Sequence, residues 1–190
     1  EFNRDSRLGA TDPGVAVVPR IDFSDANTYN NATSLTVYDA KGQTVALTYY
    51  YQKIDTDHWN VYVTANGTTL GGTEADPQPV TDLTFEASGI NPTPASLALD
   101  IPASTNSAGA ETLAITGINL DFNGSTQFGS AFAVTNLKQD GYAPGSLTGI
   151  VVEDSGIITA RYSNGQSKPA GQVELATFRN LQGLQPVGGN

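Results

Sequence analysis

The chain has 190 residues, enough for one large or two small domains, and 38 % of them are hydrophobic while 15 % are charged. A disordered chain would be poorer in apolar residues and richer in charge, so this composition predicts a packed fold. The formal net charge of −10 disfavours phosphate-rich partners, so neither nucleic acid nor an anionic membrane is an expected partner. No apolar run approaches the ~20 residues of a membrane span.

Cysteine and methionine are both absent. Without Cys, the chain has no disulfide framework, no thiolate metal site and no cysteine nucleophile. Its first residues lack the apolar core of a secretory signal peptide. Because there is no initiator Met, we expect a processed product or an excised piece, and Glu1 and Phe2 are left out of the fold reasoning as residues that cloning can add.

Strand signals dominate the first third of the chain. Apolar and polar residues alternate in residues 34–38 and 44–51, on either side of a turn predicted at Lys41-Gly42. Two such runs separated by a short loop with glycine predict a β-hairpin. Alternation resumes in residues 59–64, before a second turn signal at Asn66-Gly67, and predicts a third strand of the same meander.

The middle of the chain has weaker signals. A polar loop with prolines, residues 71–79, is expected to follow the meander, and residues 103–110, rich in Ser, Gly and Ala, are predicted to form a solvated loop. Short strands are predicted at residues 83–85, 97–101, 113–115 and 118–122.

A second three-stranded meander is predicted near the end. Its strands are residues 147–153, 157–162 and 172–178, joined by turns at Asp154-Ser155-Gly156 and Ser163-Asn164-Gly165-Gln166. Helical periodicity is nearly absent, and 20 Gly and 10 Pro interrupt the chain too often for long helices. The predicted fold class is therefore all-β.

His58, beside Asp55 and Asp57, is a candidate metal ligand. A zinc site would need more His or Cys ligands, and this is the only His in the sequence. Asp55-Thr56-Asp57 also lacks the ligand series and glycine of a calcium loop. We therefore favour a polar turn and predict no metal site and no cofactor.

No catalytic motif is present either. Gly-x-Ser-x-Gly is absent, and a Ser-His-Asp triad would have only His58 available. Glu153-Asp154 is expected to open a hairpin and not to act as the carboxylate pair of a glycosidase. The chain is therefore predicted not to be an enzyme, with no catalytic residue.

Two other features could mark a surface site. The triplets that begin at Asn31, Asn66 and Asn123 match glycosylation acceptors, but such triplets arise often by chance. Clustered aromatic residues could form a sugar-stacking platform; they are Tyr49, Tyr50, Tyr51, Trp59 and Tyr62. Alternation directs Tyr49, Tyr51 and Trp59 towards a core, so packing is the favoured role.

An ordered series of motifs resembles bacterial flagellar hook proteins. The resemblance begins near residue 20, keeps its order along most of the chain, and is weakest in residues 71–117. Its segments are Asp25-Ala26-Asn27-Thr28-Tyr29-Asn30, Ser34-Leu35-Thr36-Val37-Tyr38-Asp39-Ala40-Lys41-Gly42, Trp59-Asn60-Val61-Tyr62, Ser125-Thr126-Gln127-Phe128, Gln139-Asp140-Gly141-Tyr142-Ala143-Pro144-Gly145-Ser146-Leu147, Tyr162-Ser163-Asn164-Gly165-Gln166, Gly171-Gln172-Val173 and Leu175-Ala176-Thr177-Phe178-Arg179-Asn180. Leu181 departs from the family, in which many members carry Pro.

The resemblance implies two domains. Residues 1–137 are expected to be the outer β-domain of a hook protein, barrel- or sandwich-like, with 1–20 as a leading segment. Residues 138–190 are expected to be the C-terminal half of a smaller inner β-domain. Neither end shows the heptad spacing of the helical segments that drive hook polymerisation, so the isolated fragment is expected to be monomeric.

The resemblance also implies the biological role. The expected function is a structural subunit of the hook, the extracellular universal joint that transmits torque from motor to filament. Its expected partners are other copies of itself in a helical tube and the adjoining rod, hook-cap and hook–filament junction proteins, after passage through the flagellar export apparatus. The alternatives are a surface-exposed binding module, such as an adhesin or carbohydrate-binding β-domain, and another axial rod or hook-like protein.

Overall fold

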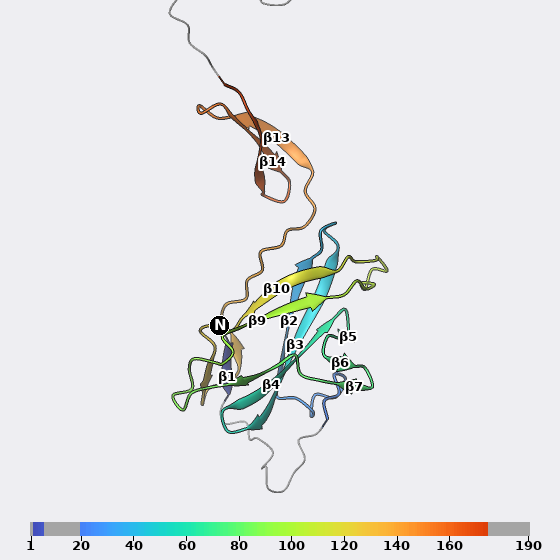
Figure 1. Ribbon diagram of the computed structural model, residues 1–190, viewed down its shortest axis with the longest axis vertical. Coiled ribbons are helices and arrows are strands. Elements are labelled where there is room, and N and C mark those ends of the chain that lie inside the picture. Colours follow the sequence, from blue (N-terminus) through green and yellow to red (C-terminus); the bar gives the residue numbers. More distant parts are fainter. Residues whose placement is uncertain (1, 6–19, 175–190) are drawn as a thin grey trace, which may run out of the picture. The chain divides into compact units, whose positions relative to one another are not determined.

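The computed structural model describes residues 2–5 and 20–174 (Figure 1). All the regular structure in these residues is β-strand, which confirms the predicted all-β class, and no helix there could span a membrane. The chain divides into two compact units: unit 1 is residues 1–143 and unit 2 is residues 144–190. Whether these units are the outer and inner domains of a hook protein stays a prediction.

Unit 1 is built on a five-stranded antiparallel sheet (Figure 1). Its strand order is β2-β3-β4-β5, and β8 pairs with β4 at the other end of that strand. The predicted hairpin, the third strand of the meander and the turn at Asn66-Gly67 are confirmed; Gly42 in the first turn has a φ of 76°. The strands are β2 (Asn31–Tyr38), β3 (Thr44–Asp55), β4 (His58–Ala65), β5 (Thr68–Thr69) and β8 (Thr81–Thr84).

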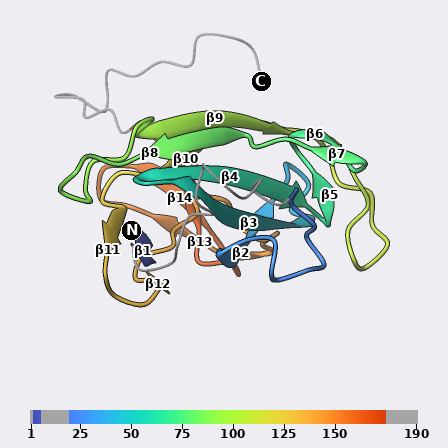
Figure 2. The same ribbon diagram turned by 90° about the horizontal axis from the view of Figure 1, so that it is seen from below.

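A second layer, strands β9 (Ser96–Ile101) and β10 (Ile115–Asp121), packs on one face of this sheet (Figure 2). The two predicted strands at residues 113–115 and 118–122 are in fact the single strand β10. A bulge between Ile115 and Ile118 contains Gly117 at a φ of 70°, and this irregularity interrupts the alternation that the prediction relied on.

Three short strands, one from the start of the chain and two from residues 126–134, form a separate sheet. Strand β1 (Phe2–Asp5) pairs in parallel with β11 (Thr126–Phe128) and antiparallel with β12 (Ala133–Val134). Phe2, which was left out of the sequence reasoning, is opposite Val134. A two-stranded ladder of β6 (Gly72–Thr73) and β7 (Asp76–Pro77) lies inside the predicted polar loop.

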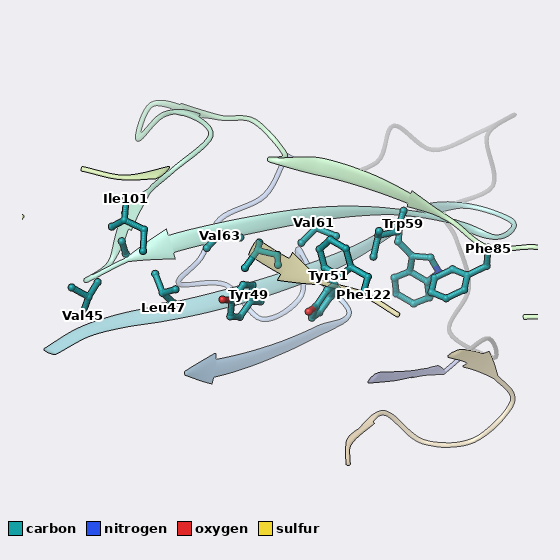
Figure 3. Packing of buried hydrophobic residues seen from close by; sticks show 13 residues of the cluster. Val45, Leu47, Tyr49, Tyr51, Trp59, Val61, Val63, Phe85, Ile101 and Phe122 are labelled. Carbon is teal, nitrogen blue, oxygen red and sulfur yellow. The ribbon is translucent and has the colours of Figure 1, made fainter. Parts of the chain in front are cut away.

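The core of unit 1 lies between the large sheet and the β9–β10 pair. Alternate residues of β3 and β4 point to the same side and meet side chains from the second layer (Figure 3). Leu47, Tyr51 and Trp59 are fully buried, so the predicted inward orientation of the aromatic residues is confirmed for Tyr51 and Trp59, and Tyr49 is 6 % exposed. The core residues include Val45, Leu47, Tyr49, Tyr51, Trp59, Val61, Val63, Ala65, Leu83, Phe85, Ile101, Leu120 and Phe122.

The opposite face of the sheet carries a smaller aromatic cluster. Tyr50 lies 4.8 Å from Phe23 and 4.9 Å from Tyr29, measured between ring centroids. The segment that contributes Phe23 and Tyr29 is fixed to β3, because the side-chain amide of Gln52 donates to the carbonyl of Thr28 at 2.7 Å. The sheet therefore has aromatic side chains on both faces.

The loop predicted to be solvated, residues 103–110, is mostly exposed, as predicted, but it is also anchored by hydrogen bonds. Asn106 is only 7 % exposed; its side-chain amide donates to the carbonyl of Thr44 at 3.2 Å, and its side-chain oxygen accepts from the backbone of Ala108 and Ala110. A further hydrogen bond joins Thr112 to Ser104. Small polar residues are typical of loops, but here their side chains replace strand pairing as the means of fixing the backbone.

Unit 2, in its described part, is a single antiparallel sheet of β13 (Leu147–Val152), β14 (Ile157–Tyr162) and β15 (Ser167–Gln172). The first two strands and both turns agree with the prediction. The third does not: β15 precedes the predicted residues 172–178, of which 175–178 lie outside the described residues. The turn is short, because the Tyr162 amide donates to the Gln166 carbonyl. Strand pairing therefore resumes at Ser167, five residues before the predicted start.

Candidate functional site

The turn between β3 and β4 contains the residues considered as metal ligands. Asp55 accepts a hydrogen bond from the backbone of Thr56 at 2.6 Å, and Asp57 takes a left-handed conformation with a φ of 62°. His58 is exposed and pairs with Asp55 across the turn. Within residues 2–5 and 20–174 no three His, Cys, Asp or Glu side chains gather as a potential metal site. Asp55 and Asp57 thus help to shape this turn, and the absence of a metal site stays a prediction.

Gln127 connects this turn to the core. Its side-chain carbonyl accepts a hydrogen bond from the Trp59 indole, and its side-chain amide donates to the Asp57 carboxylate at 2.5 Å. Gln127 is 6 % exposed and Trp59 is fully buried, so the bond between them satisfies two polar groups away from water, while Asp57 is half-buried. Sequence reasoning gave Gln127 no role, although it stood in one of the family-like segments.

Gly89, in the loop after β8, contacts the backbone of Gln127. The backbone amide of Gln127 donates to the Gly89 carbonyl at 2.6 Å, and Gly89 has a φ of 75°. A Cβ atom at Gly89 would collide with the Gln127 carbonyl oxygen. The close approach therefore requires glycine, and it fixes the loop after β8 against β11.

Parts of all three glycosylation-like triplets are held within the fold, although the acceptor Asn123 of the third is exposed. Asn31 is half-buried in strand β2, and the hydroxyl-bearing Ser125 of the third triplet is 1 % exposed. The amide of Asn66 is bound on both atoms, accepting from the Ala46 amide at 2.9 Å and donating to the Ser104 hydroxyl at 2.8 Å. Each triplet therefore contributes to the fold.

Glu153 belongs to a turn, as predicted. Its backbone carbonyl accepts from the Gly156 amide at 2.8 Å, and its carboxylate accepts from the Thr159 hydroxyl at 2.8 Å. These contacts order the β13–β14 hairpin. Whether the chain lacks catalytic residues altogether stays a prediction.

A groove of about 950 Å³ opens along the side of unit 1. It is lined by Leu35, Val37 and Tyr49 of the large sheet, by strand β10 and by residues 136–142. These sheet residues belong to the margin of the hydrophobic core or pack against it. The groove is thus the open side of a two-layer fold.

Burial and hydrogen bonding shift the pKa of several side chains in unit 1, among them Asp39 and Tyr49. Asp39 accepts from the backbone amide of Leu113 at 2.7 Å, and this bond, aided by the amides of Gln43 and Lys41, lowers the pKa of its carboxyl. Burial, with a smaller contribution from Tyr51, raises the pKa of Tyr49 to about 12. Both shifts follow from structural roles, one in a turn and one in the core.

Residues 3–142 match the family described as the flagellar basal body protein FlaE D2 domain. The chain is 31 % identical over 183 residues to the flagellar hook protein FlgE of Salmonella typhimurium, covering 96 % of this chain and 43 % of that protein. It is 32 % identical over 168 residues to FlgE of Brucella abortus, covering 87 % and 38 % of the two proteins. The chain thus spans less than half the length of these relatives.

Treponema pallidum FlgE has a shorter match of higher identity, 42 % over 81 residues, which is 43 % of this chain and 18 % of that protein. Among solved structures, the Helicobacter pylori flagellar hook protein FlgE2 aligns at 21 % identity with a TM-score of 0.48, over 84 % of this chain and 35 % of that one. The family match covers more than half of the chain. The chain therefore belongs to the flagellar hook protein family and carries its FlaE D2 domain.

Proposed function

We propose that this chain is part of a structural subunit of the bacterial flagellar hook and that it is not an enzyme. The observation that carries the proposal is the family match over residues 3–142, which includes most of the hook-like motifs of the sequence. In this role copies of the whole protein form a helical tube that bends while it transmits torque. Neither the adhesin-like nor the other axial alternative is favoured by the comparisons.

The construction of unit 1 suits a part that must carry load. Two β-layers enclose a core in which Leu47, Trp59 and Val61 are fully buried. Close-packed interiors have low compressibility, and the ladder hydrogen bonds of β2, β3 and β4 oppose shear within the sheet. A joint made of such units would bend at the contacts between them, which should be polar and modest in size.

Unit 2 suits the role of an incomplete inner domain. Its sheet exposes large apolar side chains, with Leu147 at 56 %, Ile150 at 61 % and Val152 at 63 %. An isolated sheet with an uncovered apolar face is only marginally stable, so such a face normally packs against another layer. We assign unit 1 to the outer domain and unit 2 to the C-terminal half of the inner domain, which other segments of the whole protein would complete.

The same role defines location and partners. The whole protein would pass through the flagellar export apparatus and reside outside the cell, in the hook. There it would contact other copies of itself, the rod, the hook cap and the hook–filament junction proteins. This chain by itself is expected to stay monomeric, and reversible assembly into tubes on sedimentation would contradict that expectation.

The test is immunogold electron microscopy of flagellated source cells with antibody raised against this chain. Label confined to the short curved segment between cell body and filament would support the proposal. Antibody absorbed with the purified chain is the matched control and should leave the hook unlabelled. Label on the filament or the cell surface would contradict the proposal and favour a binding module.

A further inference from the structure

The sequence has three Asn-Gly dipeptides, at Asn66, Asn123 and Asn164. Each lies in a turn, and the glycines that follow, Gly67, Gly124 and Gly165, have positive φ angles of 89°, 75° and 81°. Asn-Gly is chemically reactive because the small glycine lets its backbone nitrogen reach the side-chain carbon of the asparagine. Which of the three reacts in the folded chain depends on how firmly each asparagine amide is held.

Asn66 is held by two other elements. Its side-chain oxygen accepts from the Ala46 amide at 2.9 Å, and its side-chain nitrogen donates to the Ser104 hydroxyl at 2.8 Å. The residue is half-buried and already takes a left-handed φ of 50°. Reaction would require both hydrogen bonds to break before the Asn66 side chain could turn towards Gly67.

Asn164 is held by its own hairpin and by a close neighbour. Its side-chain oxygen accepts from the Gln166 amide at 3.1 Å, and the attacking nitrogen, that of Gly165, already donates to the Tyr162 carbonyl at 3.1 Å. A Cβ atom on Gly145 would lie 2.6 Å from the Asn164 side-chain carbon, so this amide packs directly against the Gly145 backbone. Both reacting groups are therefore occupied.

Asn123 differs from both. It is exposed, and its side-chain amide donates only to Asp121, two residues earlier in the same turn, at 2.7 Å. In the described part of the chain no hydrogen bond is made by the side-chain oxygen of Asn123 or by the amide of Gly124. Only the local bond to Asp121 has to break before the two reacting groups of this turn can approach each other, and no other element has to move.

We infer that Asn123-Gly124 is the site of spontaneous deamidation in this fold. The Gly124 nitrogen attacks the Asn123 side-chain carbon, the new C–N bond closes a succinimide, and the side-chain nitrogen leaves as ammonia with the proton of the Gly124 amide. Water then opens the ring at either carbonyl and leaves aspartate or isoaspartate. No oxidant or reductant takes part, and water is the only co-reactant.

The product would alter the β10–β11 connection. A carboxylate at residue 123 would stand beside the Asp121 carboxylate, replacing a hydrogen bond by like-charge repulsion. Isoaspartate would also lengthen the main chain within the turn that the Ser125 amide closes on the Phe122 carbonyl at 3.0 Å. Since Ser125 and Phe122 are 1 % and 2 % exposed, the change would reach buried residues next to Gln127.

The test is peptide mass spectrometry of the purified chain after incubation in warm, mildly alkaline buffer, with isoaspartate quantified at each Asn-Gly. Asn123 is expected to react about tenfold faster than Asn66 and Asn164, because each of those two sites has one more hydrogen bond to break than Asn123, and one hydrogen bond can contribute about the 1.4 kcal/mol that a tenfold rate represents. In concentrated urea the three sites should react at similar rates. Asn66 or Asn164 reacting as fast as Asn123 in the folded chain, or no site reacting there, would overturn the inference.

Two variants make the test specific. Ser104→Ala removes one hydrogen bond from the Asn66 amide and should accelerate reaction at Asn66 while leaving Asn123 unchanged. Asn123→Gln should abolish the fast reaction without changing the other two sites. Circular dichroism before incubation checks that both variants are folded. If Ser104→Ala, in its folded form, leaves the rate at Asn66 unchanged, the protective role assigned to that hydrogen bond is wrong.

Discussion

Units 1 and 2 are built from the same kind of hairpin but differ in what covers their apolar faces. In unit 1, Val45 and Val61 of the central hairpin are fully buried beneath strands β9 and β10. In unit 2, Ile150 and Val152 of β13 are 61 % and 63 % exposed, although they face Ala160 and Ile158 on the neighbouring strand. Alternation thus sets which side chains share a face, whereas burial depends on a second layer.

The comparison predicts that stability resides mainly in the core of unit 1. Leu47→Ala, at a fully buried site, is expected to lower the free energy of unfolding of unit 1 by about 2–5 kcal/mol. Urea denaturation followed by fluorescence of Trp59 measures this unit alone, because the chain has a single Trp. Ala46→Gly, on the exposed neighbouring residue, is a control for strand propensity and should cost about 1 kcal/mol or less. A small effect of Leu47→Ala would mean that unit 1 has no tightly packed core.

Alkaline pH should weaken unit 1 through Tyr49. Burial raises the pKa of Tyr49 from 10.0 to about 12, so its contribution is fully present below pH 10 and is lost as pH rises towards 12. Across that window we expect a loss of roughly 2–3 kcal/mol, at about 1.4 kcal/mol per pKa unit. Tyr49→Phe should flatten the decline, whereas Tyr142→Phe, at a residue 55 % exposed, should leave it unchanged. Urea denaturation at several pH values provides the measurement.

Removing the Gln127 side chain should have the next largest effect. Gln127→Ala leaves the buried Trp59 indole without its acceptor and is expected to destabilise unit 1 by about 1–3 kcal/mol. The Trp59 emission should change as well, because its hydrogen bond is lost. Gln139→Ala, at an exposed Gln of the same unit, is the matched control and should stay within about 0.5 kcal/mol. Equal effects of the two substitutions would exclude a special role for Gln127.

The local pattern of the sequence was sufficient to predict the hairpins but not the contacts between segments far apart in the chain. Alternation and turn chemistry located β2, β3, β4, β13 and β14, and the same alternation oriented Tyr51 and Trp59 inward. Gln127 and Asn106 could not be recognised in this way, since their partners are far away in sequence, at Trp59 and Thr44. Strand β15 was misplaced because an edge strand with Lys168 and Pro169 has no apolar alternation.

The smallest effect is expected on the exposed face of unit 2. Val152→Thr keeps a β-branched residue in β13, and at a residue 63 % exposed it should change the stability of the β13–β15 sheet by about 0.5 kcal/mol or less. Hydrogen exchange of the β13–β15 amides measures that sheet separately from Trp59. In the whole hook protein, the same substitution should cost roughly 1–3 kcal/mol if another segment covers this face, because it then removes buried apolar surface. An equally small effect in both proteins would show that the face stays uncovered and would contradict the assignment of unit 2 to a shared inner domain.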